Sequence, residues 1–198
     1  SLRRQRQMCI RDRPVWLPYS CYQGSIKFNA ANNSYLDFDG SSDWAVGTGD
    51  FTVEWWQWMK PTSAQYCRVW IVGSWYTQSI GVSIEQGDWL FWYQPTTTYF
   101  YVGYISPATL DSWNHFAISR ASGVTRFFLN GTKINEFSDA YNVSDDTTPL
   151  TIGCEGNHNS PFDGYITNFH WVKGTAKYTA NFDLPVLPPA ILLSLIHI

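Results

Sequence analysis

The sequence predicts an all-β protein, an antiparallel β-sandwich of jelly-roll type, and three observations support this class. Short runs rich in Val, Ile, Thr, Tyr, Phe and Trp recur between clusters of Gly, Asn, Asp, Ser and Pro, as in strands joined by tight turns. Helical periodicity is nearly absent, so helices are not expected to cross between parallel strands. No internal repeat of fixed period is visible, which disfavours a propeller or a solenoid.

Turn residues divide the chain into twelve expected strands. In order these are Ser25–Asn29, Tyr35–Phe38, Phe51–Met59, Arg68–Ser74, Ile80–Glu85, Trp89–Gln94, Tyr99–Ile105, Asn114–Ala121, Thr125–Leu129, Thr132–Phe137, Leu150–Gly153 and Gly164–Lys173. The clearest turn is Asn130-Gly131, because both residues tolerate positive φ and suit a two-residue hairpin. Gln86-Gly87-Asp88 joins the strands on either side of it in the same way.

The stretch DFTVEWWQWMK, Asp50 to Lys60, carries large aromatic residues on both faces of one strand. Because side chains alternate along a strand, Phe51, Val53 and Trp55 share one face. Trp56 and Trp58 share the other face with Glu54. We expect the first face to lie in the core, and the second face needs another explanation.

The two ends of the chain are expected to be translated sequencing adapter. Met8 to Arg13 can be encoded as ATG TGT ATA AGA GAC AG, whose reverse complement, CTG TCT CTT ATA CAC AT, encodes Leu193 to His197. We therefore assign residues 1–13, expected to be disordered, and residues 192–198 to adapter, and exclude them from fold reasoning. The domain is expected to span residues 14–191, with the natural chain extending beyond both ends.

Composition excludes two classes of partner. Charged residues make up 15% of the chain and aromatic residues 18%, with eleven tryptophans. Without the first 13 residues the chain loses five arginines and one aspartate, so the net charge moves from −3 to about −7. Tight nucleic-acid binding is not expected, because phosphate contacts need clustered Lys and Arg. No run of eighteen apolar residues is present, so no membrane span is expected.

Three cysteines lie outside the adapter-like ends: Cys21, Cys67 and Cys154. They are widely spaced, odd in number and without a CxxC pair, which argues against a zinc site or a complete disulfide framework. We expect buried free thiols, with a single disulfide as the alternative.

Three blocks of sequence resemble one family. SIKFNAANNSYLDFDGSSDWAVGTGDFTVEWWQWMKP resembles the opening of laminin-G-like, concanavalin A-like lectin/glucanase domains, SWNHFAISRASGVTRFFLNGTKI their central block, and LTIGCEGNHNSPFDGYITNFHWVKGTAKYTANFDLP their closing block. The resemblance covers nearly all of residues 24–186 and implies a concanavalin A-like jelly roll. The closing KGTAKYTANFDLP is similar to domains of bacteriophage tail and other virion proteins and of secreted bacterial proteins. His170 stands where these domains often have an Arg, so the role of that Arg is in doubt here.

The resemblance implies a concave, open sheet that Trp56 and Trp58 would line. Sugars stack their C–H faces on aromatic rings, while amides and carboxylates bond their hydroxyls, as in apolar pockets with a few polar groups. The carbohydrate-binding candidates are Trp56, Trp58, Trp75, Trp92, Tyr101, Asn157 and Asn159. The alternative is that these rings fill the core or pair across strands, or are covered by residues near the C-terminus.

The loop Glu155–Asp163 is the densest polar cluster of the sequence. Its oxygen-rich composition is of a kind that holds Ca²⁺, but its spacing matches no calcium motif, and we expect a solvated turn; no metal-ligating residue is assigned. His115, at the Trp-x-His position of the family, is expected to be buried and structural. His158 is expected to be an exposed loop residue.

The sequence lacks the patterns that the fold's enzymes use. Laminarinase-like relatives carry their carboxylates as Glu-x-Asp-x-x-Glu on one strand, whereas Trp56 follows Glu54 at the Asp position. No Gly-x-Ser-x-Gly motif, Cys–His pairing motif or phosphate-binding Gly loop is present either. We expect no enzyme activity.

Three functions remain open, and the least favoured is a glycosidase, which would require two carboxylates that face one another across the groove. The first is a non-catalytic, lectin-like carbohydrate-binding module for surface glycan recognition or adhesion, extracellular or in a virion tail, with glycans or glycoconjugates as partners. The alternative is a structural or protein-interaction domain of a virion or adhesin, which binds other virion or cell-surface proteins. The first predicts that Trp56 or Trp58 is accessible to solvent, and the second predicts that both rings are covered.

Overall fold

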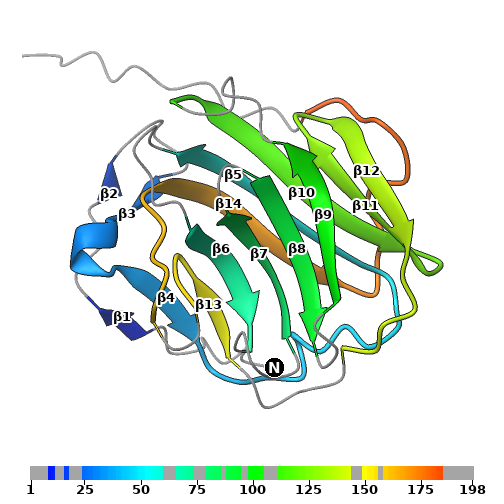
Figure 1. Ribbon diagram of the computed structural model, residues 1–198, viewed down its shortest axis with the longest axis horizontal. Helices are drawn as coiled ribbons and strands as arrows, with labels where there is room; N and C mark the ends of the chain where they lie inside the picture. Colours follow the sequence, from blue (N-terminus) through cyan, green and yellow to red (C-terminus); the bar gives the residue numbers. More distant parts are fainter. Residues whose placement is uncertain are drawn as a thin grey trace, which may run out of the picture.

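The protein is a sandwich of two antiparallel sheets, as the sequence predicts (Figure 1). The computed structural model describes residues 9–11, 16–17, 24–59, 66–73, 79–85, 88–94, 98–104, 111–143, 149–155 and 158–184; for 9–11, 16–17, 79, 85, 88–94 and 98–104 it describes the backbone alone. The strands are β1 (Cys9–Arg11), β2 (Trp16–Leu17), β3 (Ser25–Phe28), β4 (Tyr35–Phe38), β5 (Phe51–Met59), β6 (Tyr66–Val72), β7 (Ser79–Glu85), β8 (Asp88–Gln94), β9 (Thr98–Tyr104), β10 (Trp113–Ala121), β11 (Val124–Leu129), β12 (Thr132–Ser138), β13 (Leu150–Ile152) and β14 (Gly164–Lys173), with one 3-10 turn, η1 (Ala30–Asn32). No helix within these ranges has the length and apolar character that crossing a membrane requires.

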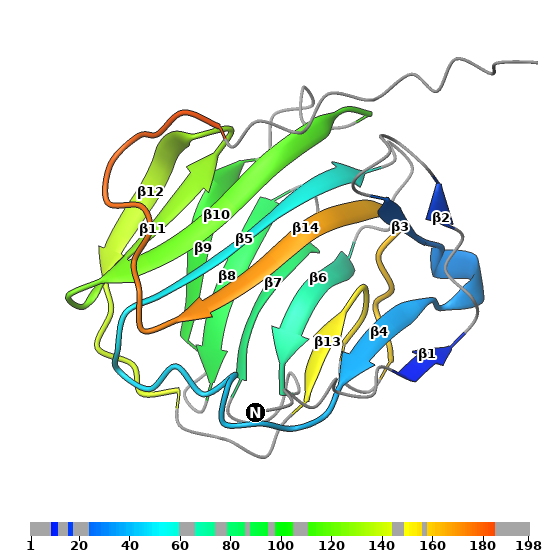
Figure 2. The same cartoon turned by 180° about the vertical axis from the view of Figure 1, so that it is seen from behind.

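Each sheet has seven strands. One, which we call the β6 sheet, has the order β1-β4-β13-β6-β7-β8-β9, and the other, the β5 sheet, has the order β12-β11-β10-β5-β14-β3-β2. The β6 sheet faces the viewer in Figure 1 and the β5 sheet in Figure 2. All twelve predicted strands are present, and no boundary differs by more than two residues.

Two strands were not predicted, and both belong to the N-terminal part of the chain. β1 pairs with β4 at the edge of the β6 sheet, and β2 pairs with β3 at the edge of the β5 sheet. β1 falls within residues 1–13, where we expected disorder, and it has strand backbone there. The adapter origin of those residues stays a prediction, because backbone pairing does not report on the coding DNA.

The core lies between the sheets, and the alternation of β5 places its residues as predicted. Phe51, Val53 and Trp55 are 0%, 0% and 1% exposed. Trp55 meets Trp70 of the opposite sheet edge-on, with 6.0 Å between ring centroids, an arrangement that aromatic pairs favour. The inner face of β5 is therefore structural, and function must be sought on the outer face.

The hairpin between β11 and β12 has the predicted turn. Asn130 and Gly131 have φ of 50° and 77°, and Leu129 pairs with Thr132 across them, so this is the two-residue turn whose twist matches the strands. The Asn130 side chain also accepts a hydrogen bond from the backbone N–H of His115, at 2.9 Å. This bond ties the turn to the start of β10.

The two cysteines that the structure describes beyond the terminal strands, Cys67 and Cys154, are free and buried, which confirms the expectation for them; Cys21 lies outside the described residues. Burial raises the pKa of the Cys154 thiol, and the nearby carboxylates of Asp37 and Glu155 raise it further. Since the thiolate is the reactive form, Cys154 is a chemically inert core residue.

A glycine substitution tests the packing of the two sheets. Gly153 has φ of 92°, and a Cβ there would lie 2.2 Å from the Phe28 ring. Gly153→Ala is therefore expected to lower the free energy of unfolding by about 1–3 kcal/mol through overpacking. The positive φ adds a backbone cost of about 1–2 kcal/mol. Gly174→Ala is the matched control, because Gly174 has φ of 81° and no atom within 4 Å of its Cβ position. Equal losses of unfolding free energy in urea would contradict the packing described here.

Candidate functional site

The C-terminal residues 174–184, which we call the strap, fold back over the outer face of the β5 sheet (Figure 2). Gly174 begins the strap with a backbone bond to the carbonyl of Asp50 at 2.8 Å. Thr52 on β5 then donates its hydroxyl to the carbonyl of Thr175 at 3.0 Å and accepts the N–H of Lys177 at 2.9 Å. The strap is thus hydrogen-bonded to the central strand of the sheet.

Aromatic stacking holds the far end of the strap. The rings of Tyr178 and Phe182 are stacked, with centroids 3.6 Å apart, and Phe182 meets Phe128 of β11 at 5.3 Å and His115 of β10 at 5.8 Å. The Phe182 N–H bonds the carbonyl of Gly131 at 2.9 Å. The closing KGTAKYTANFDLP block is therefore a cover for one part of the sheet.

Trp56 lies next to His115, which Phe182 of the strap contacts. It is 8% exposed and packs edge-on against His115, with 5.3 Å between centroids. The expectation that Trp56 lies open to a ligand is therefore wrong, because the pattern of one strand does not reveal what covers it. His115 is 1% exposed, which confirms that it is a buried residue.

Glu54 anchors the strap. This carboxylate is 3% exposed, and both of its oxygens are engaged. Oε1 accepts from the Lys177 ammonium and lies 3.2 Å from His170 Nδ1, while Oε2 accepts from the Tyr178 hydroxyl at 2.7 Å and lies 3.5 Å from His115 Nε2. His170, which stands where the family often has an Arg, supplies one of the four partners of this carboxylate.

The charge state of Glu54 follows from these partners. Burial by itself would raise its pKa, but the bonds from His115, Lys177, Tyr178 and His170 outweigh burial and hold the pKa far below its ordinary value. Burial and the bond to Glu54 raise the pKa of Tyr178 in turn, so the phenol stays protonated and donates. Glu54 is thus an anion at neutral pH that holds the strap, and it is unsuited to the role of general acid.

Glu54→Gln tests this anchor through the pH dependence of stability. A carboxylate with a lowered folded-state pKa stabilises the protein above its unfolded-state value, here 4.5, and loses that contribution as the pH falls through its folded-state pKa. The wild type is therefore expected to lose unfolding free energy below about pH 4.5 more steeply than Glu54→Gln. The measurement is urea unfolding at several pH values.

Glu136→Gln is the control for this experiment. Glu136 also has a lowered pKa, because of its bond to Lys133, but it lies exposed on β12, where ion pairs contribute little. The anchoring role would be contradicted if Glu54→Gln lost unfolding free energy with falling pH as steeply as the wild type. It would also be contradicted if Glu136→Gln changed this pH dependence as much as Glu54→Gln does.

Beyond the strap, an aromatic pocket opens on the same outer face. Trp58 is opposite Trp113 of β10 and Tyr165 of β14 in the strand register, and all three rings are half-buried. Trp58 meets Tyr165 edge-on at 5.3 Å, and Trp113 lies 6.5 Å from Tyr165. These three residues, which we call the aromatic trio, line a pocket of about 370 Å³ together with Ser25, Asp111 and Ser112.

The polar residues of the pocket are positioned by the backbone and by neighbouring amides. Asp111 has φ of 55° and donates its N–H to the carbonyl of Met59 at 3.0 Å. Ser112 Oγ accepts from Asn114 Nδ2 at 3.1 Å, which orients that hydroxyl. Ser25 is 2% exposed, and its Oγ has no hydrogen-bond partner in the part of the chain that the structure describes.

Of the predicted carbohydrate-binding residues, the structure places only Trp58 in this pocket. Trp92 and Tyr101 lie on β8 and β9 of the β6 sheet, across the sandwich from Trp58. Asn159 is exposed in the loop between β13 and β14, where its carbonyl accepts the N–H of Glu155 at 2.9 Å. Trp75 and Asn157 lie outside the described residues.

Of the six described residues that line the pocket, five were not predicted from the sequence. Trp113 and Tyr165 become neighbours of Trp58 only through the register of three strands that are far apart in sequence. A usable signal existed, since Trp113 directly precedes one predicted strand and Tyr165 is the second residue of another. Both lie next to turn residues, Asp111-Ser112 and Asp163-Gly164.

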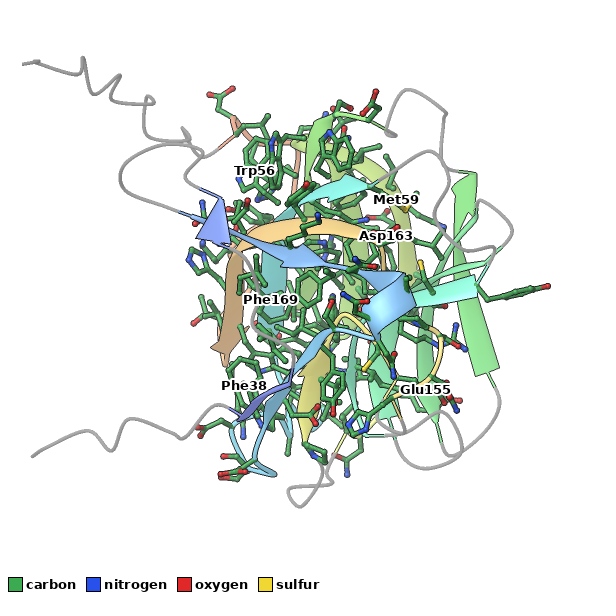
Figure 3. All side chains as sticks on the ribbon, turned by 90° about the vertical axis from the view of Figure 1, so that its left-hand side faces the viewer. Phe38, Trp56, Met59, Glu155, Asp163 and Phe169 are labelled. Atoms are coloured by element: carbon green, nitrogen blue, oxygen red, sulfur yellow. The ribbon has the colours of Figure 1, made fainter. Side chains whose placement is uncertain are left out.

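The Glu155–Asp163 loop lies apart from Trp56 (Figure 3) and is tied to the β6 sheet. His158 Nε2 lies 2.9 Å from Asp37 Oδ2, and its ring stacks on Tyr35 with centroids 4.0 Å apart. His158 is therefore a half-exposed loop residue that packs on the β6 sheet, so the expectation of an exposed loop residue is met in part. Within the residues that the structure describes, which omit Gly156 and Asn157, no three His, Cys, Asp or Glu side chains gather as a metal site.

Residues 30–176 match the family described as the concanavalin A-like lectin/glucanases superfamily. No curated protein matches the chain in sequence. Domain 4 of AbnA, an extracellular GH43 arabinanase from Geobacillus stearothermophilus, in complex with arabinotriose, is similar with a TM-score of 0.62 and 15% identity, over 86% of this chain and 77% of that one.

Two toxin domains share the fold as well. The binding domain of Paraclostridial Mosquitocidal Protein 1 has a TM-score of 0.65 and 15% identity, over 87% of this chain and 45% of that one. The ligand-binding domain of botulinum neurotoxin serotype D, in complex with N-acetylneuraminic acid, has a TM-score of 0.66 and 10% identity, over 87% and 43%. This chain spans less than half of each toxin chain, and at these identities the similarity shows the fold alone.

Proposed function

Because the chain belongs to the concanavalin A-like lectin/glucanase superfamily, we propose that it is a non-catalytic carbohydrate-binding module whose glycan site is the pocket of the aromatic trio. The observation that carries this proposal is the meeting of Trp58, Trp113 and Tyr165 on the outer face of the β5 sheet, around a pocket of about 370 Å³. Ligand sites of this size are mostly apolar with a few placed polar groups.

The chemistry of the pocket suits a sugar. Aromatic rings take the C–H faces of a pyranose or furanose, and Ser25, Asp111 and Ser112 take its hydroxyls. Two proteins of the same fold support this proposal, since one is known in complex with arabinotriose and another with N-acetylneuraminic acid.

Binding without catalysis is the activity that the carboxylates favour. Retaining glycosidases need two carboxyl groups about 5–5.5 Å apart, one of them protonated. Asp111 is the one carboxylate among the described residues that line the pocket. Glu54 is ionised and fully bonded beneath the strap, where it holds structure.

We place the module outside the cell, in a secreted protein or in the tail of a virion, where it recognises surface glycans. The resemblance of KGTAKYTANFDLP to tail and secreted domains supports this setting. The alternative function, a structural or protein-interaction domain of a virion or adhesin, is favoured by one observation, the burial of Trp56. A half-buried Trp58 in a pocket favours the glycan site.

A glycan array probed with the complete chain, with and without EDTA, tests the proposal. We expect binding to one or more glycans, unchanged by EDTA, because the pocket residues contact the sugar directly. Binding that disappears with EDTA would indicate a calcium-dependent site in a loop and would contradict the pocket as the glycan site. The absence of binding to every glycan would favour the protein-interaction alternative.

A further inference from the structure

We propose that the pocket selects uncharged sugars, and that Asp111 excludes sugars that carry a carboxylate. This inference rests on the glycan-binding function proposed above and names the class of ligand for that same site. Three features of the pocket carry it: the sign of its charge, the hydroxyl of Ser25 and the neutrality of its walls.

The sign of the charge comes from Asp111. Among the described residues that line the pocket, it is the one charged side chain. Its backbone is held at φ of 55° by the bond from its N–H to the carbonyl of Met59, which fixes the residue at the end of β5. A ligand carboxylate in this pocket would therefore meet a like charge, and like charges at close range repel.

A sugar hydroxyl suits Asp111 where a carboxylate does not. An ionised carboxylate accepts hydrogen bonds at several lone pairs and donates none. Adjacent hydroxyls of an uncharged sugar each have one hydrogen to donate, so they can bond the two oxygens of Asp111. Charge-assisted bonds of this kind are stronger than neutral ones. Asp111 is therefore expected to repel a sugar carboxylate and to bind two adjacent sugar hydroxyls.

Ser25 supplies a second polar contact. Its Oγ lines the pocket, lies almost fully buried and lacks a hydrogen-bond partner among the described residues. A buried hydroxyl without a partner is costly, and a ligand group in the pocket would relieve that cost. A hydroxyl both donates and accepts, so it matches another hydroxyl in either role.

The walls of the pocket are neutral. Trp58 and Tyr165 stand edge-on to each other, with 68° between the ring planes, so they offer two faces at a steep angle for the apolar sides of one sugar ring. Aromatic faces carry negative partial charge and attract cations and C–H groups. They do not favour an anion, so the rings and Asp111 select in the same direction.

The inference separates this chain from one of its structural relatives. The botulinum neurotoxin serotype D domain is known in complex with N-acetylneuraminic acid, which carries a carboxylate. The AbnA domain is known in complex with arabinotriose, which is uncharged. By the charge of its pocket, this chain belongs with the second kind of ligand.

An array of matched glycan pairs tests the selectivity: oligosaccharides ending in galactose beside their sialylated forms, and neutral plant glycans beside uronic-acid polymers. We expect the complete wild-type chain to bind the uncharged glycan of each pair. At low salt, where exposed charges act most strongly, we expect its affinity for the acidic glycan to be lower by about fivefold or more. Equal or better binding of acidic members would overturn this inference and leave the proposed function standing. Binding of neither kind would overturn the proposed function itself.

Two variants assign the selectivity to residues. Asp111→Asn removes the charge and keeps the size of the side chain. It is therefore expected to reduce the difference in affinity between an uncharged glycan and its acidic counterpart to about twofold or less. Ser25→Ala is expected to weaken binding of the uncharged glycan about fivefold. No loss of thermal stability is expected, because the hydroxyl has no hydrogen-bond partner among the described residues. An unchanged difference in affinity in Asp111→Asn would contradict the role given to Asp111. Wild-type affinity of Ser25→Ala for the uncharged glycan would contradict the role given to Ser25.

Discussion

Arg120→Ala is expected to lower the free energy of unfolding by about 3–5 kcal/mol, the cost of breaking a buried ion pair by removing one partner. Arg120 is completely buried, and its guanidinium donates to the carbonyls of Gly47, Gly49 and Tyr141 at 2.7, 2.8 and 3.0 Å. It also lies 3.4 Å from the buried carboxylate of Asp139 and 4.9 Å from the centre of the Phe51 ring.

The loss has a clear physical origin. Without Arg120, three carbonyls each lose a charged donor, although that of Gly47 still accepts the N–H of Val143 at 3.1 Å. The Asp139 carboxylate loses its cation, and the Thr125 hydroxyl, at 2.6 Å, and the N–H of Tyr141, at 3.0 Å, still donate to it. Most of the expected loss comes from the Asp139 carboxylate, which stays buried without its cation. Urea unfolding, followed by tryptophan fluorescence, measures the change.

Arg126→Ala is the matched control for Arg120→Ala. Arg126 lies on the neighbouring strand β11, and its partner Glu136 is exposed. Surface ion pairs contribute about 0–1 kcal/mol, so this variant is expected to unfold nearly as the wild type does. Similar losses in the two variants would contradict the account of a buried guanidinium that joins the β5 sheet to its loops.

Trp58→Ala is expected to weaken glycan binding by about 30-fold, because aromatic residues at the centre of a binding site commonly contribute about 2 kcal/mol or more. Trp58 stands between Trp113 and Tyr165 in the strand register, so its removal takes away the wall that both neighbours share. Titration with the uncharged glycan that gives the strongest array signal measures the change.

Tyr66→Ala is the control for Trp58→Ala. Tyr66 is an aromatic residue of β6, in the opposite sheet, and is 46% exposed. Its removal is expected to leave affinity within about twofold of the wild type, since residues away from a site rarely carry binding energy. Thermal unfolding of both variants separates loss of binding from loss of fold. Equal affinities in the two variants would contradict the pocket proposed here.

The fold could be predicted from the sequence because its signals are local. Alternation along Phe51–Met59 identified the buried face, and Asn130-Gly131 identified its hairpin through a property of the two residues themselves. Such features depend on neighbours in the chain, where period and turn chemistry are readable. What remained unpredicted, the pairing of β14 beside β5 and the order of each sheet, depends on contacts between distant segments.

The site could be predicted only in part, for the same reason. Trp56 and Trp58 are two positions apart on one face, yet the environment of Trp56 is closed and Trp58 borders a pocket. Trp56 packs on His115, and His115 in turn contacts Phe182 of the strap, a segment more than one hundred residues away. Alternation assigns both rings to one face, but it carries no information about what a later segment covers.

The most direct test of the glycan pocket is an NMR titration that follows the indole N–H signals of all tryptophans as the array-selected uncharged glycan is added. We expect the signals of Trp58 and Trp113 to shift, while those of Trp55 and Trp70 in the core stay in place. Shifts confined to other tryptophans, with Trp58 and Trp113 unmoved at saturation, would contradict the pocket as the glycan site.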